Sequence, residues 1–421
     1  MRPWLRKLLL AGAGVAVVLV ALVAWLNLRD EPDLDAAAGP APTAEQVERG
    51  AYLARAGNCA ACHTARGGVP YAGGSAIETP FGLVYASNIT PDPVHGIGQW
   101  TAAQFWRAMH NGRSRDGRLL YPAFPYPNFT EVTRADSDAI HAYLRSVPPA
   151  ARPNRPHALR FPYDSQAALA VWRALFFRPG VFEPDPKRSA PWNRGAYLVR
   201  GLGHCNACHA SRNIFGATTG KLEMGGGLIP MQNWYAPSLL SPVEASVAAW
   251  DTPQVVALLR DGVNQHASVL GPMAEVVYRS TQHLSNADLE AMAVFLRELP
   301  QIRPEAHEPI KRDASIMTRG GTLYRNHCAQ CHGDAGEGAS GIYPPLAGNR
   351  AVTMDAPANL VRAVVYGGYL PSTAGNPRPF GMPPFSHLLD DNDVAALLTY
   401  IRGSWGNDAP VVVPLDVLHY R

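Results

Sequence analysis

The chain has 421 residues, of which 47% are hydrophobic and 17% are charged, as in ordinary globular proteins. This length allows about three domains of the usual ~100–150 residues each. The formal net charge is only +3 and no dense basic run occurs, so we expect no nucleic-acid partner.

Residues 1–30 predict a membrane segment. Arg2, Arg6 and Lys7 precede an uncharged apolar run from Leu8 to Leu26. This run is close to the ~20 residues that span a bilayer core. Its positive end should stay in the cytoplasm, which places the rest of the chain on the periplasmic side of the cell inner membrane. The alternative is a cleaved signal peptide, with 36–38 as a possible cleavage site, but the apolar run is long for such a peptide.

The pentapeptide Cys-x-x-Cys-His occurs three times and accounts for all 6 cysteines. In this motif the two thiols bond to the vinyl groups of a porphyrin and the histidine binds the iron. The sequence therefore predicts three covalently bound haem c groups. The attachment residues are Cys59, Cys62, Cys205, Cys208, Cys328 and Cys331, and the axial iron ligands are His63, His209 and His332.

Other uses of paired cysteines fit this pattern less well. A disulfide framework gives no reason for a histidine after every second cysteine. A structural zinc site needs about four ligands from two nearby pairs, whereas these pairs lie more than a hundred residues apart. A thioredoxin-like Cys-x-x-Cys needs a strand before a helix, and no strand pattern surrounds any copy.

Each motif lies inside a longer repeat. A segment of the form Arg-Gly-x-x-Leu precedes each copy and predicts a helix that leads into the haem loop, at 49–53, 194–198 and 319–323. A capped helix closes each repeat, with an aspartate three residues after the cap. The three caps are Thr133, Ser285 and Asp390. Between them a third helix is expected to stop at a glycine. These glycines are Gly112, Gly262 and Gly367.

The repeats predict an all-α fold, with three tandem cytochrome c domains preceded by one N-terminal transmembrane helix. The expected domains span 44–147, 189–300 and 315–404. Proline-rich linkers at 32–42, 148–191 and 300–309 connect these parts. The second linker contains an apolar helical stretch, 169–177. We expect this stretch to pack against domain one or two, or else to lie on the membrane surface or against a partner subunit.

A second axial ligand is expected between the third and last helices of each repeat. A methionine thioether in this position raises the reduction potential of the iron. Met273 follows Gly-Pro in the second repeat, and Met382 lies between Gly and Pro in the third. Methionine often fills core gaps, but a loop position beside glycine and proline favours iron ligation for both residues.

The first repeat departs from this pattern. Phe124 stands where a methionine is expected, and phenylalanine cannot bind iron. The nearest donors are Met109 and His110 on the preceding helix, and then His95. We take Met109 as the candidate ligand, since a soft thioether already inside the pocket could turn to the iron. The alternatives are a five-coordinate iron or a histidine ligand.

The segments 194–199, 201–209 and 234–237 resemble the triheme cytochrome c subunit of bacterial membrane-bound dehydrogenases. So do the segments 115–118 and 121–126. This family serves periplasmic alcohol, aldehyde and gluconate dehydrogenases, and the resemblance covers nearly everything after the anchor. The same cysteine and histidine ligands, with Met273 and Met382, match the family's positions.

The resemblance implies an electron-transfer subunit. It would accept electrons from a separate catalytic subunit that holds pyrroloquinoline quinone, flavin or a molybdenum and iron–sulfur cofactor set, and pass them to ubiquinone. Phe124 in place of the family's methionine is similar to the variant partnered with molybdenum-type aldehyde dehydrogenases.

The residues suggest no substrate site of the chain's own. We find no phosphate-binding glycine loop after a strand and no nucleophile–base set in the sequence. Two other functions remain open. One is a multihaem peroxidase, which needs the open iron that Phe124 would leave. The other is a stand-alone or oxidase-linked cytochrome c carrier.

Overall fold

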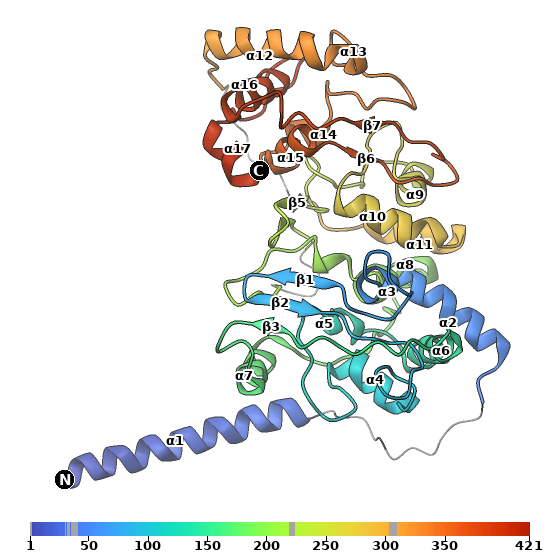
Figure 1. Cartoon of the computed structure of the whole chain (residues 1–421), viewed down its shortest axis with the longest axis vertical. Coiled ribbons are helices and arrows are strands. Elements are labelled where there is room, and N and C mark those ends of the chain that lie inside the picture. Colours follow the sequence, from blue (N-terminus) through green and yellow to red (C-terminus); the bar gives the residue numbers. More distant parts are fainter. Residues whose placement is uncertain (1, 30, 32–33, 35–40, 219–223, 303–309) are drawn as a thin grey trace. The chain divides into compact units, whose positions relative to one another are not determined.

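The computed structural model describes residues 2–29, 31, 34, 41–218, 224–302 and 310–421 (Figure 1). The chain divides into two compact units. The first consists of residues up to Leu53 together with Cys62–Glu183, and the second of Ala54–Ala61 and Pro184–Arg421. The possible cleavage site at 36–38, and most of the linkers 32–42 and 300–309, lie outside the described residues.

The first repeat and the N-terminal helix belong mainly to the first unit. Its helices are α1 (Pro3–Leu28), α2 (Ala44–Ala56), α3 (Cys59–His63), α4 (Ala102–Asn111), α5 (Tyr126–Phe129), α6 (Arg134–Ser146) and α7 (Gln166–Phe176). Its strands are β1 (Ala76–Thr79), β2 (Gly82–Tyr85) and β3 (Ala158–Leu159), which form one antiparallel sheet in the order β1-β2-β3. Helix α1 is long and apolar enough to cross a membrane, and its apolar stretch is exposed.

The second and third repeats share the second unit. The helices of the second repeat are α8 (Ala190–Ala196), the π-helical η1 (Tyr197–Leu202), η2 (Cys205–Ala207), α9 (Thr252–Asp261), α10 (Pro272–Arg279), η3 (Thr281–His283) and α11 (Asn286–Arg297). Those of the third are α12 (Ala314–His327), α13 (Ala329–His332), α14 (Arg350–Thr353), α15 (Ala358–Tyr366), α16 (Asp391–Arg402) and α17 (Pro414–Tyr420). Two strand pairs complete the unit, β4 (Gly227–Ile229) with β5 (Trp234–Ala236) and β6 (Gly368–Tyr369) with β7 (Gly381–Met382).

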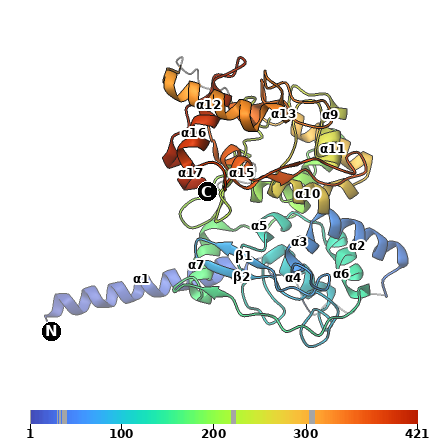
Figure 2. The same ribbon diagram turned by 45° about the horizontal axis from the view of Figure 1, so that its top comes forward.

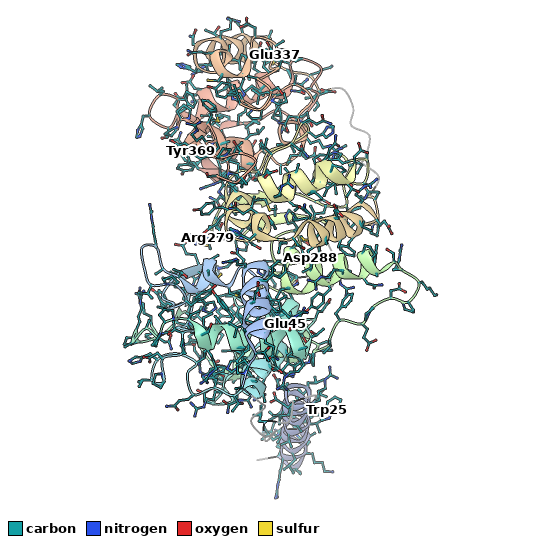
Figure 3. The ribbon with its side chains drawn as sticks, turned by 90° about the vertical axis from the view of Figure 1, so that its right-hand side faces the viewer. Trp25, Glu45, Arg279, Asp288, Glu337 and Tyr369 are labelled. Atoms are coloured by element: carbon teal, nitrogen blue, oxygen red, sulfur yellow. The ribbon has the colours of Figure 1, made fainter. Side chains whose placement is uncertain are left out.

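The first and last helices of each repeat are joined by an ion pair. In every case the arginine of the Arg-Gly-x-x-Leu segment donates from Nε to the aspartate that lies three residues after the helix cap. The pairs are Arg49–Asp136 at 2.9 Å, Arg194–Asp288 at 2.8 Å and Arg319–Asp393 at 3.0 Å. Figure 3 labels Asp288, the acidic member of the second pair.

The glycine after each arginine lets these two helices touch. A Cβ atom at this glycine would overlap a backbone carbonyl oxygen of the last helix. The overlapping residues are Gly50 and Ala139, Gly195 and Ala291, and Gly320 and Ala396. The Arg-Gly dipeptide is therefore the crossing point of the two helices in all three repeats.

The predicted helix boundaries are confirmed. The side chains of Thr133, Ser285 and Asp390 accept hydrogen bonds from the backbone N–H three residues later. Helices α4 and α9 end at Gly112 and Gly262, both in the left-handed conformation that glycine adopts without strain. The stop at Gly367, after α15, is also found.

The second repeat inserts a π-helical turn before its haem motif. The first cysteine follows the crossing arginine by 10 residues in the first repeat, 11 in the second and 9 in the third. A π-helical turn accommodates an additional residue within a helix. Segment η1 takes up the extra residue there, so Arg194 can reach Asp288 although its distance to Cys205 is longer.

The expectation of an all-α fold is confirmed in its main part, because most elements are helices. A helix directly precedes each motif, as expected, whereas the short strand pairs that follow are not expected from the sequence. A strand pair follows the haem motif of each repeat, and the longest of these strands have only 4 residues. Such short ladders show no alternation of apolar and polar residues. They depend on turns such as the one at Gly82, where φ is +126°.

The crossing predicts the effect of adding a methyl group. Gly195→Ala should lower the free energy of unfolding of the second unit by about 2 kcal/mol, since overpacking costs about 1–3 kcal/mol and outweighs the gain of up to ~1 kcal/mol in helix propensity. Thermal unfolding followed by circular dichroism measures the change. Gly14→Ala in α1, where no atom lies within 4 Å of the added Cβ, is the matched control and should not lower the midpoint.

Candidate haem sites

The six cysteines lie on short helical turns that follow the crossing helices. Within each motif the first cysteine is less exposed than the second. Cys59 and Cys205 are half-buried and Cys328 is buried, whereas Cys62, Cys208 and Cys331 are exposed. Burial raises the pKa of the Cys205 thiol to about 12 and that of the Cys328 thiol to about 11.

The three motif histidines make the same hydrogen bond. Nδ1 lies near a backbone carbonyl oxygen that follows the motif in sequence. The distances are 2.7 Å from His63 to Ser87, 2.7 Å from His209 to Pro237 and 3.1 Å from His332 to Pro344. A carbonyl oxygen can only accept, so Nδ1 carries the proton and the lone pair lies on Nε2. Nε2 is therefore the atom available to an iron ion in all three sites.

Electrostatics favours the same form of these rings. Desolvation by burial lowers the pKa of His63, His209 and His332, and the hydrogen bond to the carbonyl opposes this only in part. The neutral imidazole is the form that binds metals. Each ring is thus neutral, oriented and ready to bind through one nitrogen.

This donor set fits haem c. Two thiols on one helical turn and a neighbouring imidazole with a free Nε2 are the groups that thioether attachment and axial ligation require. Within the described ranges, no group of three or more His, Cys, Asp or Glu side chains could hold a metal ion directly.

Met273 and Met382 both lie between the third and last helices of their repeats, as expected. Met273 is the second residue of α10, packed against Val269 and Val277. Met382 ends the short strand β7 and packs on the core of the third repeat. Both are only partly buried, and their assignment as iron ligands stays a prediction.

In the first repeat the candidate donors lie on α4. Met109 is buried, and its sulfur accepts a contact from the Ser137 hydroxyl at 3.9 Å. His110 directs Nδ1 to the Thr130 carbonyl oxygen at 2.8 Å and stacks on Trp106. The Phe124 ring packs on Phe129. The ligand role of Met109 also stays a prediction.

Sequence reasoning missed the carbonyl acceptors of the motif histidines. Two of the three belong to prolines, Pro237 and Pro344. The acceptors lie 12 to 28 residues after the histidines, and this separation varies between repeats, so the sequence carries no local signal for them.

The second and third repeats are joined by reciprocal hydrogen bonds that sequence reasoning also missed. The Tyr235 N–H donates to the Asn359 side-chain oxygen at 2.9 Å, and the Asn359 amide donates to the Tyr235 carbonyl oxygen at 2.8 Å. The guanidinium of Arg362 lies over the Trp234 ring, with 5.4 Å between its carbon and the ring centroid. These contacts explain why the two repeats form one compact unit.

Known proteins resemble this chain along most of its length. A family model described as cytochrome c matches residues 47–148 and 317–405. The chain is 38% identical over 420 residues to the cytochrome c subunit of an alcohol dehydrogenase (quinone) from Gluconacetobacter polyoxogenes, covering 95% of this chain and 87% of the relative. It is 36% identical over 386 residues to the cytochrome c subunit of gluconate 2-dehydrogenase from Pantoea cypripedii, covering 87% of each.

A third relative is much longer. It is a subunit of the nicotinate dehydrogenase of Pseudomonas putida, and it is 41% identical over 375 residues, which are 87% of this chain and 31% of that protein. The middle repeat lies outside both ranges of the family model. It nevertheless has the Arg-Gly crossing and the histidine-to-carbonyl bond of the other two.

Removal of one thiol pair should remove one haem. We expect the double substitution Cys205→Ala and Cys208→Ala to leave a protein with two covalent haems, because thioether attachment needs these sulfurs. Intact-mass spectrometry of the mature protein counts the attached groups. Three haems in the double variant, or no covalent haem in the parent, would contradict the assignment.

The methionine assignments can be tested by spectroscopy. Met273→Leu and Met382→Leu should each remove one methionine-type low-spin signal from the absorption and magnetic resonance spectra, since leucine has a similar volume but no donor atom. Met292→Leu, at a buried methionine of α11, is the matched control and should keep every signal.

The same substitution at Met109 examines the first haem site. Loss of a further methionine-type signal in Met109→Leu would make Met109 its ligand. An unchanged spectrum would leave Met109 as a packing residue beside Ser137.

Proposed function

Because this chain belongs to the cytochrome c subunits of membrane-bound, quinone-linked dehydrogenases, we propose that it relays electrons through three covalent haems from a separate catalytic subunit to ubiquinone. The haem, when bound, supplies the one-electron redox chemistry. The protein contributes the attachment sulfurs, the orientation of each axial imidazole and the surroundings that set each potential.

One observation carries this proposal. The same arrangement, a neutral imidazole held by a backbone carbonyl beside two thiols, occurs three times on one chain. A single site would fit many functions of haem proteins. Three equivalent sites on consecutive repeats fit a relay, in which an electron is passed from one iron to the next.

The second unit supports this relay by its rigidity. Transfer between two haems depends on a constant separation, and the bonds between Tyr235 and Asn359 connect the second and third repeats directly. A further bond joins Arg350 of the third repeat to the Ser246 carbonyl oxygen of the second, at 2.6 Å. We therefore propose that the second and third haems form a fixed pair.

The catalytic partner is proposed from the relatives and from one residue. The named relatives belong to alcohol, gluconate and nicotinate dehydrogenases. We propose a partner of the pyrroloquinoline quinone, flavin or molybdenum and iron–sulfur type. Phe124, which resembles the variant of molybdenum-type aldehyde dehydrogenases, favours the last of these. The haem repeats would lie on the periplasmic side of the cell inner membrane, because the positively charged N-terminal end of α1 should stay in the cytoplasm.

Two alternatives follow from the same residues. A multihaem peroxidase needs an iron with an open position, which the Phe124 substitution could leave in the first repeat. A stand-alone or oxidase-linked carrier needs no catalytic partner. The family membership of the chain favours the dehydrogenase subunit over both.

Purification from native membranes tests the function. We expect the full chain, solubilised in detergent, to co-purify with a large catalytic subunit whose substrate reduces the haems and then a water-soluble ubiquinone. The control is the complex that carries the double substitution of Cys205 and Cys208, which should reduce ubiquinone at a much lower rate. A chain that is purified alone and is reduced by no substrate would support the carrier. Turnover of hydrogen peroxide with a reduced donor would support the peroxidase.

A further inference from the structure

A polar junction ties the last turn of α1 to helix α7. The Asn27 side-chain nitrogen donates to the Ala170 carbonyl oxygen at 2.9 Å, and its side-chain oxygen accepts from Nε of Arg173 at 3.0 Å. Both Asn27 and Arg173 are buried. Helix α7 therefore lies beside the end of α1 that leads into the rest of the chain, as Figures 1 and 2 show.

Glu31 extends this junction to α4 and the loop after it. Its carboxylate oxygens lie 2.7 Å from Nε of Arg113 and 3.7 Å from a terminal nitrogen of Arg107. Only 8% of the Arg107 side chain is exposed. Cleavage after Glu31 would take its carboxylate away from both arginines, and a buried charge that loses its partner destabilises a protein strongly. The junction thus favours an α1 that is kept in the mature protein.

The aromatic residues of α1 show where the membrane surface would lie. Trp4 and Trp25 stand near the two ends of the helix, and both are more than half exposed. At about 1.5 Å per residue they are separated by about 30 Å, which is the thickness of the hydrocarbon core. Tryptophan prefers the two interfaces of a bilayer. Trp25, labelled in Figure 3, therefore marks the outer interface, two residues before Asn27.

One face of helix α7 is covered by the protein, and its other face is apolar and exposed. Leu169, Arg173 and Ala174 are buried on the inner face. Val171, Leu175 and Phe176 are exposed on the other, with 62% of Leu175 accessible. An exposed face of this kind, at the level of the outer interface, is unfavourable in water and favourable among lipid head groups and upper acyl chains.

We propose that α7 is an interfacial helix, whose face of Val171, Leu175 and Phe176 contacts the lipid surface beside the retained anchor. This proposal rests on the anchor part of the proposed location, and not on the electron relay. The exposed Arg160 and Arg178 flank the helix and suit the phosphates of anionic lipids, with one carboxylate, Asp164, before its N-terminus. The anchor and α7 together would hold the first repeat at the membrane at two places.

Photolabelling of the full-length protein tests this contact. The purified chain is placed in bilayer discs of phosphatidylethanolamine and phosphatidylglycerol that contain a phospholipid with a diazirine near its head group. After illumination, mass spectrometry maps the labelled peptides. We expect label in α1 and in α7. Substitution of both Val171 and Leu175 by Gln should reduce the α7 label several-fold and leave the α1 label unchanged.

Leu415→Gln with Leu418→Gln provides the matched control. These two side chains of α17 are at least as exposed as those of α7, and their replacement should not change the α7 label. A mature protein without α1, or a protein in which α1 is labelled and α7 is not, would overturn the proposal. So would cross-linking of α7 to a co-purified subunit in native membranes, since that result assigns the face to a protein partner.

A variant of the junction tests whether labelling of α7 depends on its attachment to α1 as well as on its exposed apolar residues. Asn27→Leu removes the bonds to Ala170 and Arg173 but keeps the lipid-facing residues. We expect the α7 label to fall while the number of attached haems, counted by mass, stays the same. An α7 label that is unaffected by Asn27→Leu and also by the Gln substitutions would show that the labelling is not specific, and would overturn the proposal.

Discussion

The contact between a glycine and a backbone carbonyl, where the first and last helices of each repeat cross, positions everything else. The ion pair beside it contributes as well, because only 3% of the Asp136 side chain is exposed, although 56% of the Arg49 side chain is. A methyl group at Gly50, Gly195 or Gly320 would meet a carbonyl oxygen that cannot move without its helix. The glycine sets the distance between the helices, and the arginine with its aspartate sets their register.

Features that depend on neighbouring residues could be read from the sequence. The caps at Thr133, Ser285 and Asp390 and the helix stop at Gly112 each depend on groups within one helical turn. The haem motif itself is of the same kind. These signals depend only on residues close in the sequence, and they can therefore be recognised without knowledge of the rest of the fold.

Features that depend on distant residues could not be read in this way. The sequence analysis identified the arginines and the aspartates of the crossings, but it did not predict that they form ion pairs, because 74 to 94 residues separate the partners. The π-helical turn follows from one extra residue between Arg194 and Cys205, and a count of residues shows this only once the crossing is known. The hydrogen bonds between Tyr235 and Asn359, which join the second and third repeats, connect residues that are 124 positions apart.

Helix α4 connects the residues that follow α1 to the helix crossing of the first repeat. Arg107 of this helix faces Glu31, which follows α1, and Met109, two residues further along, contacts Ser137 of α6. Helix α6 is in turn the helix that Gly50 and Arg49 contact at the crossing. A displacement of α1 would therefore have to break a largely buried ion pair or move α4, and movement of α4 would disturb the packing on α6. Because buried, well-packed helices resist such displacement, these contacts hold the end of α1 against α4 and, through it, against α6.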